Sequence, residues 1–339
     1  MTEQNAYRPY WYVVAHADEV TEKPKQVILL GERLVLFRNE EGVQALKDLC
    51  IHRGAELSGG KVVNGNIECP YHGWQYNGQG RCVLIPSIPE SQPIPSKAKT
   101  QSYHVAEHLG MVWVALEEPR LPLPVPPHDW LWSADDPKLR VMKRHNLHWK
   151  TSAGRWAENA FDVSHFAFVH GGLLSSTSDT LIAEHSVRET ESTIDYEYNQ
   201  VQPGDPGSYG KGYVHLHYHY VAPFTLFLHR RTPDGTYSLF FVNGSPVGPR
   251  DVKLYSLMIR DYDIEPEKDH VFLEFLKTAM DQDQSVVETV HPEEIPVDLR
   301  EELHIKVPDA GGVALRRLFA RIEKGYEFGK KTASAVAAE

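Results

Sequence analysis

Two cysteine–histidine pairs are the residues of this chain whose types and spacing are best suited to chemistry. They stand in the runs Cys50-Ile-His52 and Cys69-Pro-Tyr-His72. Two loops that each supply one thiolate and one imidazole can provide two thiolates for one iron and two imidazoles for another. In such a [2Fe–2S] centre, neutral nitrogen ligands replace two anionic thiolates and raise the reduction potential. The two pairs therefore predict an iron–sulfur centre that transfers electrons.

A structural zinc ion is the alternative, because two Cys and two His also form a closed tetrahedral site. Zinc fingers usually space each pair more widely and place a helix after the second pair. Here the residues 73–76 alternate like a strand, and Asn77-Gly78 is typical of a hairpin turn. Glycines beside both pairs suit tight loops whose amides approach cluster sulfurs. The sequence favours a Rieske cluster bound by Cys50, His52, Cys69 and His72.

A second group of candidate metal ligands lies in residues 162–170, which read Asp-Val-Ser-His-Phe-Ala-Phe-Val-His. Two histidines and one carboxylate form a facial triad that leaves positions on Fe(II) open for oxygen. Asp162 and His165 are three residues apart, so a helix would place them on one face. His165 and His170 would lie about 140° apart around an ideal helix. We therefore expect the helix to distort or end between the two histidines.

The elements that must position these residues fall into two groups. The first third of the chain predicts β-strands, and Leu121–Pro127, with four prolines, predicts a stiff linker. Further strands and helical stretches follow, which predicts an α+β fold with domains at 8–118 and 119–330 and a flexible tail at 331–339. The expected strands are Trp11–Val14, Gln26–Leu30, Arg33–Phe37, Met111–Leu116, Tyr213–Tyr220, Tyr237–Val242 and Lys253–Arg260, and the last helix is Val313–Phe328.

Composition limits the classes of protein. The 339 residues are enough for two domains, each with its own core. Of only three cysteines, Cys82 is left as a small buried hydrophobe, and no disulfide framework is expected. The net charge of −11 argues against a nucleic-acid partner. With no signal-peptide pattern and no transmembrane run, we expect a cytoplasmic protein without a membrane partner.

Both metal motifs, in this order, resemble the terminal oxygenase components of Rieske non-haem iron oxygenases over residues 8–330. The resemblance implies that His165 and His170 bind a mononuclear Fe(II) together with an aspartate on a late helix, here Asp269–Val287. We prefer Asp283 to Asp281, because the family's aspartate is followed shortly by an apolar pair, as at 286–287. The resemblance also implies a homotrimer in which Asp162 links an iron-ligating histidine to a Rieske histidine of the neighbouring subunit.

Within the family, the chain resembles vanillate and dicamba O-demethylases, methylxanthine N-demethylases and saxitoxin-type hydroxylases. The implied reaction is monooxygenation of a small aromatic or heterocyclic substrate, either hydroxylation or O- or N-demethylation. O2 is the co-substrate, and electrons come from NAD(P)H through a separate ferredoxin/flavin reductase, because the chain has no nucleotide or flavin signature. A ring cis-dihydroxylating dioxygenase is the alternative within the family, and a Rieske-type electron carrier is the alternative from another class.

The substrate pocket is less well defined by the sequence. Leu276 and Met280 share the helix face of Asp283 and are predicted pocket walls, whereas Ala279 and Val287 are expected to be plain core. Asn159 is a further substrate-binding candidate, and the apolar face disfavours a purine-like substrate. The histidines at 215, 217 and 219 share one strand face and are predicted to be solvated or pocket-facing. The loops 175–178 and 203–207 are predicted to be mobile caps of the site.

Overall fold

The structure is a computed structural model that describes residues 3–130, 132, 133, 136–143, 146–178, 180–208 and 212–328. The predicted tail at 331–339 lies outside the described residues. In the described part of the chain, β-sheets form the N-terminal third, and a large antiparallel sheet with helices forms the remainder. The predicted α+β class is therefore confirmed. No helix in the described ranges is both long and apolar enough to span a bilayer.

The N-terminal part is built from three small antiparallel sheets. Their strand orders are β1-β10-β9, β2-β3-β4 and β5-β6-β7-β8. The four predicted strands of this part are all present, within one or two residues of the expected bounds. The strands are β1 (Tyr12–His16), β2 (Lys25–Leu29), β3 (Glu32–Asn39), β4 (Gly42–Lys47), β5 (Lys61–Val63), β6 (Asn66–Glu68), β7 (Gln75–Tyr76), β8 (Cys82–Leu84), β9 (His104–His108) and β10 (Met111–Ala115).

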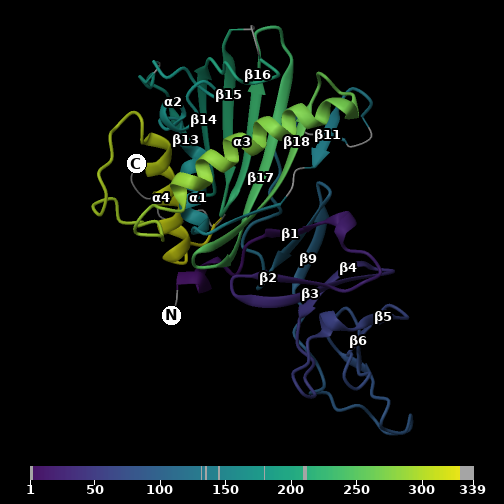
Figure 1. Cartoon of the computed structure of the whole chain (residues 1–339). Coiled ribbons are helices and arrows are strands. Elements are labelled where there is room, and N and C mark those ends of the chain that lie inside the picture. Colours follow the sequence, from purple (N-terminus) through teal and green to yellow (C-terminus); the bar gives the residue numbers. More distant parts are fainter. Residues whose placement is uncertain are drawn as a thin grey trace, which may run out of the picture.

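The C-terminal part is one 8-stranded antiparallel sheet with the order β11-β18-β17-β16-β15-β14-β13, in which β12 also pairs with β18. Helix α3 runs across this sheet (Figure 1). The strands are β11 (Arg140–Lys143), β12 (Leu147–Trp149), β13 (Val187–Glu189), β14 (Thr193–Gln200), β15 (Val214–Val221), β16 (Thr225–Arg231), β17 (Tyr237–Gly248) and β18 (Asp251–Arg260). The helices are α1 (Ala153–Phe161), α2 (Phe166–Val169), α3 (Asp269–Val287) and α4 (Ala310–Glu323).

Helix α3 has the bounds expected from the sequence, because its apolar residues recur at helical spacing and pack on the sheet. Helix α4 begins three residues before the predicted Val313 and ends at Glu323, so the predicted end at Phe328 is wrong. Gly325 has φ +72°, a left-handed conformation typical of the residue just after a helix.

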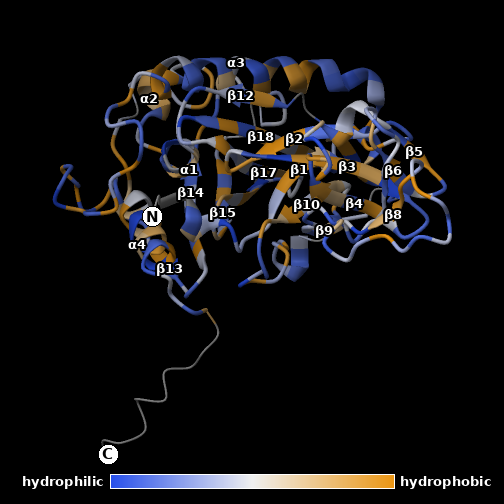
Figure 2. Cartoon of the chain, turned by 90° about the horizontal axis from the view of Figure 1, so that it is seen from below, coloured by the Kyte–Doolittle hydropathy of each residue, from blue (hydrophilic) through white to orange (hydrophobic). Residues whose placement is uncertain are grey.

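The two parts share much of their hydrophobic core, which the sequence did not predict. Val13 of β1 donates a backbone hydrogen bond to Asn243 Oδ1 of β17 at 3.0 Å, and the Trp113 ring lies 5.8 Å from the Phe241 ring. Two hydrophobic clusters contain residues from both parts of the chain. Figure 2 shows apolar residues on β1, β17 and β18, where the parts meet. Besides these shared clusters, each part has a smaller cluster of its own, under β3 to β8 in the N-terminal part and between the sheet and α3 in the C-terminal part.

The shared core leaves two regions far apart. In Figures 1 and 2, the loops around β5 and β6 lie at one end of the molecule and α2 lies at the other. The first region carries the cysteine–histidine pairs, and the second carries His165 and His170 at the two ends of α2. One chain therefore holds its two candidate metal sites at opposite ends.

Candidate metal centres

The two cysteine–histidine loops have the same backbone design. The Gly54 amide donates to Cys50 O at 2.9 Å, and the Gly73 amide donates to Cys69 O at 3.1 Å. Both glycines are left-handed, with φ of +77° and +68°, a conformation that side chains other than glycine rarely adopt. The chain therefore turns back sharply after each cysteine–histidine pair, at the point where the sequence places a glycine.

The thiols and imidazoles of these loops differ in exposure. Cys50 and Cys69 are buried, and burial raises the pKa of the Cys69 thiol. The His52 and His72 rings lie 4.6 Å apart at the outer end of the loops, and His52 stacks on Trp74 at 4.6 Å. His52 Nδ1 is buried and has no hydrogen-bond partner in the described part of the chain. An inner pair of thiols and an outer pair of imidazoles fit the donor set of a Rieske cluster.

The hairpin after the second pair is longer than predicted. Strands β7 and β8 are joined by residues 77–81 and not by a two-residue Asn-Gly turn. Asn77 Oδ1 accepts hydrogen bonds from the amides of Gln79 (3.1 Å) and Arg81 (2.9 Å). The asparagine therefore closes a wider loop through its side chain.

Asp162 and His165 are in contact, but they do not share a helix face as predicted. Helix α1 ends at Phe161, and Asp162 has extended backbone angles. Its carboxylate accepts the Ser164 amide at 3.0 Å and the His165 amide at 3.0 Å. The same carboxylate accepts His165 Nδ1 at 2.8 Å. A local turn closed by the aspartate side chain, and not helical spacing, therefore holds the histidine.

The expected break between the two histidines is present. His165 and His170 flank the four-residue helix α2 at its N-terminal and C-terminal ends. The carboxylate of Asp283, from α3, lies between their rings: Oδ1 is 3.3 Å from His165 Nε2 and 2.9 Å from His170 Nε2. The ligand atoms of the three residues all lie within 4.8 Å of one another. The structure thus brings together residues more than a hundred positions apart in the sequence.

The orientation of the imidazoles fits a metal better than a hydrogen-bonded cluster. Both Nε2 atoms are buried and have no partner of hydrogen-bond geometry in the described ranges, although Asp283 is close to each. The other ring nitrogens are occupied: Asp162 accepts His165 Nδ1, and Gln282 Oε1 accepts His170 Nδ1 at 2.8 Å. Carboxylate and amide oxygens only accept, so the Nδ1 atoms carry the protons. The Nε2 lone pairs are left for a cation beside Asp283.

Electrostatics at this site favour a positive charge. Burial disfavours a charged His165, but Asp162 and Asp283 outweigh burial and raise the pKa of His165 to about 9. Burial disfavours an ionised Asp283, but the two histidines lower its pKa to about 2. Asn159 Nδ2 donates to Asp283 Oδ1 at 3.1 Å and holds the carboxylate in place. The competing residue Asp281 instead points to solvent, where it pairs with Lys277.

Comparison with known protein families agrees with both sites. Residues 10–104 match the Rieske [2Fe-2S] domain. Residues 149–325 match the Vanillate O-demethylase oxygenase C-terminal domain, which is more than half of the chain. The chain belongs to the Rieske oxygenases.

Individual relatives of this Rieske oxygenase match over most of its length. Methylxanthine N3-demethylase NdmB of Pseudomonas putida is 32% identical over 312 residues, which are 87% of this chain and 85% of the relative. Methylxanthine N1-demethylase NdmA of the same organism is 28% identical over 338 residues, 97% of this chain and 93% of the relative. The solved structure of NdmA with caffeine has a TM-score of 0.81 at 26% identity and covers 95% of this chain and 90% of that chain.

Membership of the family establishes the general activity. The chain is the terminal oxygenase component of a multi-component system, an oxidoreductase that uses one Rieske [2Fe–2S] cluster and one mononuclear iron. Its electrons come from separate transfer partners, and its substrates are small molecules. The inner thiols, the outer imidazoles and the convergent Nε2 atoms described above fit these two groups.

A small cavity of about 130 Å³ reaches the three convergent residues. Leu276, Met280 and Asn159 line it, and so does Ala279, for which the prediction of plain core packing is wrong. Val287 packs in the core, as expected. The other side chains that line the cavity come from α1, α2, α3, the segments after α2 and β14, and the sheet: Trp156, Ala160, Phe166, Leu174, Gln202, Tyr218, Leu226, Leu228, Arg230, Phe240, Val242 and Phe275.

The sheet wall of this cavity was missed by the reasoning from sequence. On β15, Leu216 and Tyr218 face the helices, so the alternating His217 and His219 lie on the opposite face. Of the two predicted alternatives, a solvated or a pocket-facing strand, the pocket-facing one is wrong. There both histidines bond to Asp195 Oδ1, at 3.2 and 2.8 Å. The sequence of β16 does indicate this wall, because Leu226, Leu228 and Arg230 alternate and therefore lie on one face of the strand.

Of the two loops predicted to be mobile, the second is packed and the first is mostly exposed. Ser175 and Asp205 are buried. The Gly204 amide donates to Leu173 O at 2.9 Å, so the second loop lies against the segment that follows α2. Asp205 also pairs with Arg230 at 2.6 Å. These contacts tie the second loop to the cavity wall, so it is not a mobile cap, whereas residues 176–178 of the first loop are exposed beside the buried Ser175.

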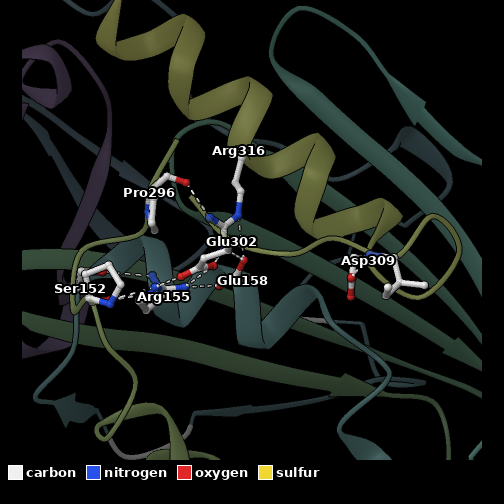
Figure 3. Close-up of polar contacts among 9 residues, drawn as sticks. Ser152, Arg155, Glu158, Pro296, Glu302, Asp309 and Arg316 are labelled. Atoms are coloured by element: carbon white, nitrogen blue, oxygen red, sulfur yellow. Dashed lines mark hydrogen bonds and ion pairs between the residues drawn. The ribbon is translucent and has the colours of Figure 1, made fainter. Parts of the chain in front are cut away.

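A partly buried ionic network joins α1, α4 and the segment before α4 (Figure 3). Arg155 of α1 pairs with Glu158 at 2.9 Å and with Glu302 at 2.6 Å. Arg316 of α4 pairs with the same two carboxylates at 2.5 Å each and donates to Pro296 O at 2.6 Å. Two arginines and two glutamates thereby join α1 and α4. They also line a second cavity of about 330 Å³ that includes Asp162 and His165.

Proposed function

We propose that this Rieske oxygenase is a monooxygenase that hydroxylates, or removes a methyl group from oxygen or nitrogen of, a small aromatic or heterocyclic compound. The observation that carries the proposal is the convergence of His165, His170 and Asp283 on the edge of an apolar cavity. Three protein ligands on one side leave room for O2 and substrate on the other. The cavity is smaller than the roughly 300–1,000 Å³ of drug-sized sites, which favours one-ring or fused two-ring compounds.

The residues that hold the two metal groups are part of this proposal. Cys50 and Cys69 would bind one iron of the cluster, and His52 and His72 would bind the other, in keeping with the inner and outer positions of these side chains. His165, His170 and Asp283 would bind the mononuclear iron. When bound, the cluster supplies single electrons, and the mononuclear iron activates O2.

The surrounding side chains orient these ligands and the substrate. Asp162 and Gln282 hold the two imidazoles in the tautomer whose Nε2 is free, and Asn159 holds Asp283. The apolar walls, with Leu276 and Met280, keep water away from the reacting methyl or ring carbon. The N-demethylase relatives and the O-demethylase family model support demethylation as the first reaction to test.

We propose that electrons cross between subunits of a homotrimer through Asp162. The two sites lie at opposite ends of one chain, so transfer within a chain would be long. The side chains beside the cluster histidines are exposed and apolar, with Tyr71 65% and Ile51 45% exposed. The second cavity, which Asp162 and His165 line, is where the cluster histidines of a neighbouring copy would approach. A closed head-to-tail ring would satisfy every subunit in the same way.

The test is reconstitution with both metal groups, NADH and a surrogate ferredoxin/flavin reductase, followed by a screen of methoxyarenes, N-methyl heterocycles and fused-ring hydrocarbons. Demethylation consumes one O2, two electrons and two protons, and it yields the demethylated product, formaldehyde and water. A cis-diol as the main product would instead indicate a dioxygenase. Two irons per chain, together with electron transfer but no O2-dependent product, would indicate an electron carrier. The monooxygenase should contain three irons per chain.

A further inference from the structure

One wall of the substrate cavity carries a buried charge. Leu226, Leu228 and Arg230 alternate along β16 on the face toward the helices, and all three line the cavity. The Arg230 side chain is only 5% exposed, and its guanidinium lies over the Phe240 ring at 5.3 Å. A charged side chain is unexpected at a buried position that alternates with leucines, because burying a charge is costly unless it is paired.

The charge of Arg230 is already balanced. Its Nη2 donates to Asp205 Oδ2 at 2.6 Å and to Gln202 Oε1 at 2.6 Å, and Nη1 donates to Ser238 Oγ at 3.3 Å. Asp205 is 2% exposed, so the ion pair is desolvated on both sides. The cavity is therefore lined here by an arginine whose charge is already neutralised.

Gln202 adds a second donor of the same kind. Its carbonyl oxygen accepts from Arg230. Its amide nitrogen donates to no residue in the described part of the chain, and the side chain lines the cavity. A guanidinium has five N–H groups, of which only some are used by Asp205, Gln202 and Ser238. This wall thus offers hydrogen-bond donors to a ligand.

We propose that Arg230 and Gln202 form a recognition subsite for an uncharged hydrogen-bond acceptor, such as a ketone, amide or ring carbonyl, on the substrate. The subsite rests on the proposed function only in that the cavity is taken as the substrate site. It selects substrates that carry a carbonyl away from the methyl group to be oxidised. Such a subsite would also accept the carbonyl groups of a purine-like substrate, which the apolar face of α3 is expected to disfavour.

The preference for an uncharged acceptor follows from Asp205. A substrate carboxylate would lose its hydration in the cavity and would face an arginine that Asp205 already neutralises. A neutral carbonyl loses far less hydration and still gains the donor groups. A ligand with no acceptor would leave the donors of Gln202 without a partner. The expected order of affinity is neutral carbonyl first, with apolar and anionic analogues weaker by about tenfold.

Three nearly isosteric anisoles test this order: 4-methoxyacetophenone, 4-isopropylanisole and 4-methoxybenzoate. Binding is measured by calorimetry on the full-length protein with both metal groups bound, without O2, so that no turnover occurs. The ketone should bind about tenfold more tightly than either analogue. Equal affinity for the ketone and isopropyl compounds, a preference for the carboxylate, or no binding of the ketone would overturn the proposal.

Two variants separate the parts of the subsite. Asp205→Asn leaves Arg230 unbalanced, so 4-methoxybenzoate should gain at least about tenfold relative to the ketone. Gln202→Leu keeps the ion pair and should reduce the advantage of the ketone over 4-isopropylanisole. Gln200→Leu is the matched control, because Gln200 is buried nearby but does not line the cavity, and it should keep the wild-type order.

The outcomes distinguish this subsite from the proposed function. If Asp205→Asn does not fold, the order of ligand affinities in the wild-type protein and the result for Gln202→Leu still test the subsite. An unchanged preference in Gln202→Leu, together with no gain of the carboxylate in a folded Asp205→Asn, would overturn the subsite even where turnover is normal. Conversely, the expected binding order without any O2-dependent product from the ketone would contradict the proposed function and leave the subsite standing.

Discussion

Gln282 offers a sharp test of how the iron site is ordered. Its Oε1 accepts His170 Nδ1 at 2.8 Å, and this histidine is fully buried. Gln282→Leu keeps a side chain of similar size and a good helix former. It leaves the buried Nδ1–H without an acceptor, or lets the proton move to Nε2, where it blocks the metal lone pair. Either result lowers the affinity for iron.

The loss of Fe(II) affinity in Gln282→Leu can be estimated in two ways. Loss of an oriented hydrogen bond behind a metal-ligating histidine costs roughly 10–100-fold in metal affinity. At about 1.4 kcal/mol for each factor of ten, this is about 1.4–2.8 kcal/mol. A stranded buried donor costs about 1–3 kcal/mol. The two ranges agree, so we expect Fe(II) to bind 10–100-fold more weakly in the variant, as a rough estimate.

The assay is competition for Fe(II) against a colorimetric chelator, with the visible spectrum of the cluster as an internal check. Gln284→Leu is the matched control, because Gln284 is two residues further along α3 and bonds to Glu288 at 2.7 Å, away from the imidazoles. Equal Fe(II) affinity in the two variants would refute the view that Gln282 orders His170. Loss of the cluster spectrum in Gln282→Leu would show that the effect is not local.

Four further predictions address the remaining groups. Asp283→Ala should lose the mononuclear iron but keep the cluster, whereas Asp281→Ala should keep both, and iron analysis showing the reverse would move the ligand to the other aspartate. His72→Ala should bleach the visible cluster spectrum, and a normal spectrum would refute its assignment. Asp162→Asn should bind both metals and keep a reducible cluster yet form no product, and near-normal single-turnover electron transfer would contradict the bridging role. Burial, with Arg231 and neighbouring histidines, lowers the pKa of His229 to about 4. The contribution of neutral His229 to the free energy of unfolding is therefore full above about pH 6.5 and is lost as the pH falls toward 4. Urea unfolding should show that the free energy of unfolding falls less between pH 7 and pH 5 in His229→Phe than in the wild type, by at most about 2 kcal/mol.

The elements best predicted from sequence are those whose pattern is local. The bounds of α3 are correct because its apolar residues recur at regular helical spacing. The end of α1 was not predicted, because Asp162 uses its carboxylate to bind the backbone amides of Ser164 and His165 in place of helical bonds. Asn77 changes the predicted hairpin in the same way.

The cavity was predicted only in part, for a reason of distance along the chain. Residues on the Asp283 helix could be placed by spacing, which gave Leu276 and Met280. Arg230 and Gln202 come from β16 and a loop after β14, and no local rule brings them to α3. Arg230 could have been noticed as a charge in an apolar register, but its partner Asp205 could not.

The two metal sites therefore differ in how far apart in the sequence the residues that shape each site lie. Each loop of the cluster site is closed by a bond within four residues, from Gly54 to Cys50 in the first case, so a short motif is enough to describe it. The iron site instead depends on α3 being held against α1, through Asn159 and Asp283. Helix α1 is in turn fixed by the partly buried arginine–glutamate network of Figure 3. A change in that network would disturb iron binding and leave the cluster intact, because the cluster loops lie at the far end of the molecule.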